Sequence, residues 1–239
     1  MRILLLPRDI LDQIRLIVGE TRGECETGVV LFGTRISRII SRVSYAADVW
    51  PTLVRHYHVV LAVAGPGPRA THEPAHYSAD TDYASGIYQA LQTALPAIEW
   101  LGELHVHPWG MTWLSDGDRR TVKDLLGSTA TDTVSPEEFI AGVMQRRKHG
   151  VAIYPYYFSR RLLEGCEIGI EYIPADADLV REARRVAAES RHVLLPEDAH
   201  PDGCRNDEHQ TSQGWLATVV NRMRRKTHDE RTQRRKHEG

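Results

Sequence analysis

Apolar residues recur along this chain with two periods, one typical of α-helices and the other of β-strands. The opening run 2–6 has the length of a short strand, and after Pro7 apolar residues recur at helical spacing. Helices are predicted at 10–18, 81–95, 118–126 and 177–191. Strands are predicted at 2–6, 28–32, 36–45, 58–64, 98–106, 138–145, 151–159 and 166–173.

These elements mix helices with strands, which predicts an α/β or α+β domain with one central sheet over residues 1–175. The stretch 65–68 consists of glycine and proline and predicts an irregular crossover loop. We expect a surface helix within 176–194, then a linker at 195–214, where Pro, Asp, Gly, Asn and Gln gather. Residues 215–239 are locally basic and predict a helical or disordered tail.

Composition narrows the class of protein. Among 239 residues, 41% are hydrophobic and 26% are charged, which is typical of a soluble globular protein. A formal net charge of −2 argues against a general nucleic-acid binder, and the basic tail leaves nucleic acid or an acidic protein only as minor alternatives. The 3 cysteines cannot all pair, and no apolar run is long enough to cross a membrane, so we expect a cytoplasmic protein.

Two histidines one residue apart, His105 and His107, end the predicted strand 98–106. Because side chains alternate along a strand, both imidazoles fall on the same face of the sheet. Asp118 follows at the start of the next predicted helix. Two imidazole nitrogens and one carboxylate oxygen form a three-ligand zinc set, and a fourth position left to water is typical of a catalytic site.

A hydrolytic zinc site also needs a carboxylate that takes a proton from water and passes it to the leaving group. Glu26 is our candidate, because it stands just before an apolar strand that can hold it rigidly at the edge of the sheet. Glu24 and Glu103 are the competitors. Glu103 precedes His105 by two residues, so it shares the face of the histidines and could support them.

Ser115 admits two interpretations. Its hydroxyl can donate to the carbonyl oxygen of a substrate as negative charge develops there, a role worth about 3 kcal/mol. Alternatively, Ser115 and Asp118 form a capping box, in which the serine and the carboxylate three residues later satisfy backbone donors at the start of a helix. The spacing alone does not separate the two.

Taken together, these motifs resemble the JAMM (MPN+) zinc metallopeptidases, and the prokaryotic JAB branch in particular. Residues 26–33 read ETGVVLFG and are similar to the family's E-T-G-G-hydrophobic-G motif, with Val29 as one departure. Residues 102–108 read GELHVHP, and with Ser115 and Asp118 they resemble the H-x-H-x7-S-x-x-D signature. The resemblance implies a JAB/MPN-type mixed sheet flanked by helices, followed here by a C-terminal extension.

The resemblance spans about residues 5–174 and includes the 65–68 loop with Asp80 or Asp82 downstream. It implies one zinc ion per chain and a defined role for each matching residue. The implied zinc ligands are His105, His107 and Asp118, the implied general base and acid is Glu26, and the implied oxyanion stabiliser is Ser115.

The family's enzymes cleave after the C-terminal glycines of ubiquitin or ubiquitin-like proteins. The resemblance therefore implies an isopeptidase that acts on a bacterial ubiquitin-like protein, with E1-like and E2-like enzymes as partners, in some systems linked to phage defence. Trp109 and Trp113 lie between the expected ligands, where they either line a groove for the glycine tail or pack the loop onto the domain. Two alternatives stay open: a hydrolase for a sulfur-carrier protein or small peptide, and a non-catalytic zinc-containing interaction module.

Overall fold

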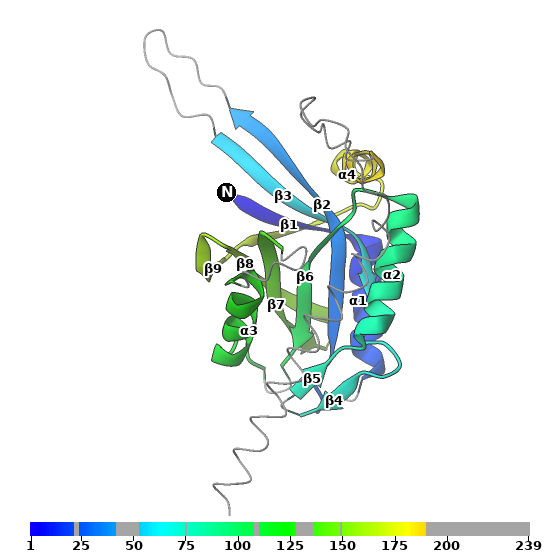
Figure 1. Ribbon diagram of the computed structural model, residues 1–239, viewed down its shortest axis with the longest axis vertical. Coiled ribbons are helices and arrows are strands. Elements are labelled where there is room, and N and C mark those ends of the chain that lie inside the picture. Colours follow the sequence, from blue (N-terminus) through cyan, green and yellow to red (C-terminus); the bar gives the residue numbers. More distant parts are fainter. Residues whose placement is uncertain are drawn as a thin grey trace, which may run out of the picture.

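The computed structural model describes residues 1–21, 24–41, 53–74, 76–107, 110–127, 136–148 and 150–189, which form an α+β fold. Helices are interspersed among the strands along the chain, and they flank a mixed sheet (Figure 1). In chain order they are β1 (Arg2–Pro7), α1 (Arg8–Glu20), β2 (Gly28–Ser41), β3 (Leu53–Ala64), β4 (Thr71–Glu73), β5 (His76–Ser78), α2 (Thr81–Ala94), β6 (Glu99–Val106), α3 (Asp116–Gly127), β7 (Glu138–Arg147), β8 (Gly150–Ser159), β9 (Leu162–Glu167), β10 (Gly169–Ile173) and α4 (Asp178–Ala188).

The main sheet has eight strands in the order β10-β1-β3-β2-β6-β7-β8-β9, and β4 pairs with β5 in a separate hairpin. Strand β1 runs parallel to β10 and to β3, and β6 runs parallel to β7, whereas the remaining neighbours are antiparallel. The sheet curls, and the amide of Ile168, between β9 and β10, donates to the carbonyl of Pro155 in β8 (3.1 Å). The chain thereby passes from one edge of the sheet to the other.

Both faces of the sheet are covered by apolar side chains from helices. On one face α1 contributes Ile10, Leu11, Ile14 and Val18 to a cluster with six strands of the main sheet, from β1 to β8. On the other face α2 and α3 pack against the centre of the sheet, and α4 packs against β2 and β3. The apolar residues of β6 beside the histidines, Leu104 and Val106, belong to this core, which fixes the end of the strand.

Gly102 determines the backbone path of β6. Its φ of +155° belongs to a region that side-chain-bearing residues rarely adopt, and a Cβ there would lie 1.9 Å from the carbonyl oxygen of Ile140. The pairing with β2 shifts register at this point, between Leu31 and Phe32. A glycine bulge thus decides which face of the sheet the residues beyond it present, including His105.

The structure confirms the α+β class and most of the predicted elements, although two predicted strands are merged, one is divided, and the short strands β4 and β5 are not among the predictions. The predicted strands 28–32 and 36–45 are one strand, β2, because Gly33 does not end it. Instead Gly33 allows close approach to β3, where a Cβ would lie 2.0 Å from the carbonyl oxygen of Val59. The predicted strand 166–173 is divided between β9 and β10 at Ile168, where the chain changes edge. The predicted linker and tail lie outside the described residues.

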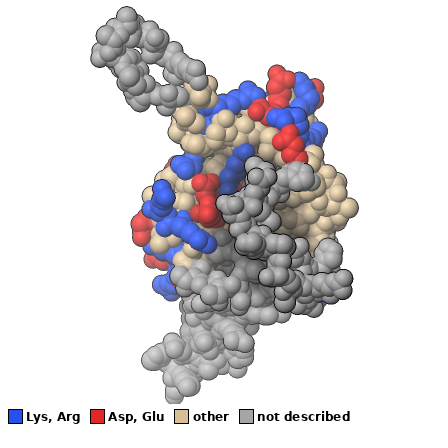
Figure 2. Space-filling model, turned by 45° about the horizontal axis from the view of Figure 1, so that its top comes forward, with Lys and Arg blue, Asp and Glu red and all other residues tan. Residues whose placement is uncertain are grey.

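Charged side chains of both signs share the surface. Over the described part of the face in Figure 2, basic and acidic groups are interspersed. Some of them join neighbouring elements, as Arg38 of β2 does with Glu182 of α4, and Lys123 of α3 with Glu164 of β9. Among the described residues, no helix combines the length and the apolar character needed to span a bilayer.

A partly buried polar cluster lies among β1, β2, β3, β7 and β8. The hydroxyl of Tyr157 donates to Glu138 (2.7 Å), and Arg35 pairs with the same carboxylate at 3.4 Å. The guanidinium of Arg2 lies 3.9 Å from the centre of the Tyr157 ring. His58 is 2% exposed, and its Nε2 has no hydrogen-bond partner among the described residues.

We expect His58 to make the protein lose stability in mild acid. Burial, with Arg35 and Arg2 nearby, lowers the pKa of His58 from 6.5 to about 4, although Glu138 opposes the shift. The unfolded chain therefore binds more protons than the folded chain between pH 6.5 and pH 4, so stability is full above pH 6.5 and falls as pH drops through this window. The loss reaches about 3 kcal/mol, and urea unfolding at a series of pH values measures it.

His58→Gln is the matched control, because glutamine does not titrate. The variant should lose less stability than the wild type between pH 7 and pH 4.5, whatever carboxylates elsewhere contribute to both. Equal losses in the two proteins would show that His58 is not held neutral in the fold.

Candidate metal centre

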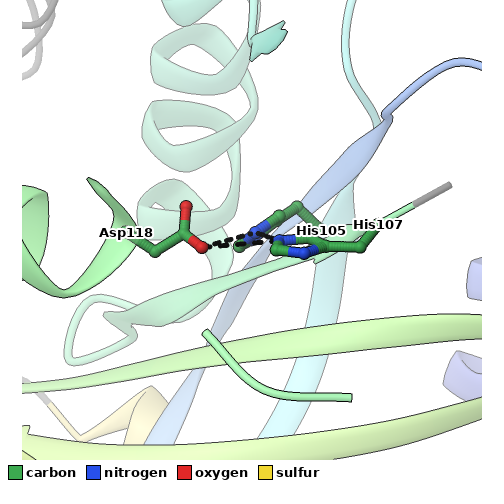
Figure 3. Close-up of side chains that lie close together, drawn as sticks. All are labelled: His105, His107 and Asp118. Atoms are coloured by element: carbon green, nitrogen blue, oxygen red, sulfur yellow. Dashed lines mark hydrogen bonds and ion pairs between the residues drawn. The ribbon is translucent and has the colours of Figure 1, made fainter. Parts of the chain in front are cut away.

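Three side chains predicted as metal ligands converge in the structure. His105 lies in β6, His107 follows the strand directly, and Asp118 lies in the first turn of α3 (Figure 3). The Nε2 atoms of the two histidines are 2.6 Å apart, and Oδ2 of Asp118 is 3.4 Å from each of them. Their ligand atoms all lie within 4.8 Å of one another, so the group could hold a metal ion.

The spacing of these atoms fits a small tetrahedral ion. Nitrogen or oxygen ligands about 2.0–2.1 Å from zinc lie about 3.3 Å from one another. The two separations of 3.4 Å from Asp118 match this value, and the two histidine nitrogens need to move apart by less than about 1 Å. Two imidazoles and a carboxylate are also a donor set that zinc accepts with a fourth position left open.

The electrostatics of the cluster favour a cation. Burial acts to raise the pKa of Asp118, but hydrogen bonds from the two imidazoles and from Ser115 outweigh it and hold that pKa well below its ordinary value. Burial acts to lower the pKa of His105, yet Asp118 and Glu26 outweigh it and raise that pKa. A half-buried group of carboxylates thus surrounds the imidazoles and attracts positive charge.

Pairing between strands fixes the two histidines. His105 stands opposite Gly28 of β2 and opposite Val143 of β7 in the register of the sheet. The amide of Val106 donates to the carbonyl of Thr27 at 2.7 Å, which extends the pairing of β2 with β6 up to His107. His107, 7% exposed, is therefore held in place although it lies beyond the end of the strand.

Ser115 and Asp118 form the capping box at the start of α3. The amide of Asp118 donates to the Ser115 hydroxyl (3.2 Å), while Oδ2 of Asp118 accepts from the amide (2.8 Å) and the hydroxyl (2.7 Å) of Ser115. This Oδ2 is the atom that faces both histidines. The cap therefore aims the ligand oxygen, and the oxyanion role of Ser115 stays a prediction.

Glu26 is brought to the same site. Its amide donates to the carbonyl of Glu73 in β4 (3.0 Å), and its own carbonyl accepts from Nδ1 of His72 (2.9 Å). Burial raises the pKa of the half-buried Glu26 carboxyl, His105 and His107 lower it, and Asp118 raises it. The carboxyl thus lies within electrostatic reach of all three candidate ligands.

The competing carboxylates are placed differently. Glu24 is exposed in the turn before Glu26. Glu103 is enclosed on β6, where burial raises its pKa to about 7 against the opposing effect of His105. Burial and Glu103 together raise the pKa of Tyr77, so the carboxyl and the phenol are close in space. Such an enclosed carboxyl suits support of His105 better than exchange of protons with substrate.

The hairpin β4–β5 is the part of the site that the sequence did not predict. Tyr77 of β5 packs on Gly28, where a Cβ would lie 2.5 Å from Cε1 of the ring. His72 and Glu73 of β4 hold the backbone of Glu26. Two three-residue strands are too short to show a period, so no strand is predicted there and the sequence carries no local signal for the hairpin.

The remaining residues singled out in the sequence are the two tryptophans after the histidines and Asp80. Trp113 is 57% exposed, in the segment between His107 and α3, whereas Trp109 lies outside the described residues. Asp80 caps α2, accepting from the amide of Tyr83 (3.3 Å) and from Arg69 (2.9 Å). Asp80 is therefore a structural residue in this fold.

Comparisons with known proteins do not assign the chain to a family. No family profile matches it, and no curated protein matches it. One similar solved structure is the solution structure of a structural genomics target from Desulfitobacterium hafniense. It is 14% identical, the match covers 73% of this chain and 94% of that chain, and the TM-score is 0.47.

Proposed function

We propose that this protein is a zinc-dependent isopeptidase or peptidase of the JAMM type. It cleaves after the C-terminal glycine of a bacterial ubiquitin-like protein, either to release a conjugate or to mature a precursor. One observation carries the proposal: Oδ2 of Asp118 lies 3.4 Å from the Nε2 atoms of both His105 and His107. The half-buried carboxyl of Glu26 within reach of that cluster supports a hydrolytic use. The class of substrate comes from the sequence resemblance.

His105, His107 and Asp118 would hold the zinc ion, which would supply Lewis acidity to polarise a carbonyl group and to lower the pKa of water. Glu26 accepts the proton of the attacking water and delivers it to the departing amine. Burial raises the pKa of Glu26, which makes its carboxylate a stronger base toward the attacking water.

Ser115 supplies the second catalytic function in this proposal. Its hydroxyl turns from Asp118 toward the substrate carbonyl oxygen and donates to it as negative charge develops. The amide of Ser115 keeps its own hydrogen bond to Asp118 (2.8 Å), so the ligand oxygen stays aimed while the hydroxyl is in use.

An extended glycine tail suits the surroundings of the site. Glycines without side chains can run close to the backbone of a sheet, where main-chain hydrogen bonds hold them. The exposed ring of Trp113, on the segment that leads from His107 to α3, offers an apolar wall beside the ligands. We propose that the tail lies against this ring.

The proposed setting is a bacterial conjugation system. E1-like and E2-like enzymes are the partners that such a protease serves, and phage defence is a role that fits the resemblance. The thiols of Cys25 and Cys166 are free in the structure, which fits a reducing cytoplasm.

The first test is cleavage of a ubiquitin-like protein joined through its C-terminal glycine to a reporter. We expect release of the reporter by the zinc-loaded protein, none after chelation, and recovery when zinc is restored. Metal analysis on the same samples gives the zinc content. Stoichiometric zinc without cleavage of any fusion or conjugate would contradict the proposal and favour a zinc-containing interaction module.

A further inference from the structure

The backbone of Glu26 is held by the β4–β5 hairpin, which is separate from the main sheet. Glu26 lies two residues before β2, and the pairing of β2 with β6 reaches back to Thr27, whose carbonyl accepts from the amide of Val106 (2.7 Å). The amide of Glu26 donates to the carbonyl of Glu73 (3.0 Å), and its carbonyl accepts from Nδ1 of His72 (2.9 Å). Both backbone groups of residue 26 therefore bond to one strand, β4.

The bond from His72 comes from a side chain, and the acceptor fixes its direction. A carbonyl oxygen can only accept, so Nδ1 of His72 carries the hydrogen. This nitrogen donates in that neutral tautomer and in the imidazolium alike, so the bond holds in either form. Fixing the N–H and C=O groups of a residue fixes the direction of its Cα–Cβ bond, and with it the region that the side chain can reach. The bond from His72 therefore bears on where the Glu26 carboxyl lies.

Ring contacts anchor His72 in turn. Its imidazole lies 5.8 Å, centre to centre, from the ring of Tyr77 across the hairpin, with 37° between the ring planes. Tyr77 packs on Gly28, and Gly28 stands opposite His105 in the pairing of β2 with β6. A continuous set of contacts thus runs from the strand that carries His105, through Tyr77 and His72, to Glu26.

We propose that His72 is a positioning residue for the general base. Its hydrogen bond holds residue 26 so that the carboxyl of Glu26 stays beside the candidate metal ligands, whose charges act on it. His72 is not one of those three ligands, so it acts on the chemistry through Glu26. The proposal rests on the proposed function, in which Glu26 is the base. It implies that loss of the donor slows turnover and leaves metal binding unchanged.

Two substitutions in the full-length, zinc-loaded protein separate the hydrogen bond from the bulk of the side chain. His72→Asn keeps a donor on an atom bonded to Cγ, where Nδ1 stands in histidine, whereas His72→Gln moves the donor one bond further out. His72→Gln should lower kcat for the reporter fusion by about 10- to 100-fold, because a small misplacement of a catalytic group has effects of this size. KM and zinc content should stay at their wild-type values, and His72→Asn should restore most of the rate.

His76→Gln is the matched control, since it makes the same substitution in the same hairpin, opposite Glu73. It should cleave at the wild-type rate. A wild-type kcat in His72→Gln would overturn the proposal. Equal losses of kcat in His72→Asn and His72→Gln would also overturn it, because they would assign the effect to packing of the imidazole ring.

Amide hydrogen exchange tests the placement of Glu26 without any turnover. The amide of Glu26 should exchange about tenfold faster, or more, in His72→Gln than in the wild type and in His72→Asn, because its bond to Glu73 opens more often. The amide of Val106 is the internal reference for the main sheet and should keep its protection in all three proteins. If the wild type cleaves no fusion, the proposed function fails and exchange alone decides on His72. Unchanged protection of Glu26 in His72→Gln would then overturn the positioning role.

Discussion

Glu26→Gln should retain its zinc ion and lose a factor of about 10²–10⁴ in the rate of cleavage. Glutamine has the size of glutamate and keeps the backbone contacts of residue 26 with Glu73 and His72, but it cannot accept a proton. The substitution leaves the proposed metal ligands, His105, His107 and Asp118, unchanged. Turnover of the reporter fusion and zinc content of the same preparation measure the two halves of the prediction.

The two competing carboxylates provide the controls. Glu24→Gln changes an exposed residue two positions before Glu26 and should cleave at the wild-type rate. Glu103→Gln changes the enclosed carboxyl on β6 and should retain turnover that Glu26→Gln lacks. Normal turnover in Glu26→Gln, together with loss in either other variant, would assign the base to that residue instead.

The convergence of the three ligands follows from local rules that a sequence displays. A period of two places His105 of β6 and His107, which directly follows the strand, on one face of the sheet. The spacing of Ser115 and Asp118 sets a capping box, and the cap turns the Asp118 carboxylate toward the end of the strand. Each rule concerns residues a few positions apart, so each was predictable.

The position of Glu26 depends on long-range pairing, which the sequence does not display. Its backbone is held by β4, more than 40 residues later in the chain. Glu26 and His72 are 46 positions apart in the sequence. Tyr77, which packs on Gly28 and approaches Glu103, comes from the same unpredicted hairpin. Hydrophobic periodicity reports burial along one strand, whereas these contacts arise between strands that are too short to be periodic.

The same distinction explains the errors in the strands. Gly33 looks like the end of a strand because glycine is common in turns, yet here it relieves crowding against Val59 inside β2. Ile168 lies within the predicted strand 166–173. In the structure it stands between β9, which pairs with β8, and β10, which pairs with β1. In both cases a tertiary contact between strands outweighs the local pattern.

The second large effect that we expect is a loss of metal affinity, and it follows from the negative charge around the candidate ligands. Asp118, Glu26 and Glu103 all act on His105, and their combined negative charge raises its pKa despite burial. A bound divalent ion would balance this negative charge. Removing the charge of the one carboxylate that faces both histidines should therefore weaken metal binding strongly.

Asp118→Asn should lower the affinity for zinc by at least about 100-fold, a factor that loss of a supporting contact alone can reach. The asparagine carbonyl can still accept from the amide of Ser115 and maintain the cap of α3, so the fold is preserved. A neutral amide oxygen is a much poorer zinc ligand than a carboxylate. Competition with a chromophoric chelator measures the affinity, and the stabilisation that zinc gives the wild type in thermal unfolding should disappear.

Asp116→Asn is the matched control, because Asp116 lies in the same first turn of α3, is exposed and is not a candidate ligand. It changes net charge and the charge near the helix start by the same amount as Asp118→Asn. We expect its zinc affinity to equal that of the wild type. Equal losses in both variants would mean that Asp118 acts only through its charge at the helix start. Wild-type affinity in Asp118→Asn would remove Asp118 from the ligand set and with it the geometry on which the proposed hydrolysis depends.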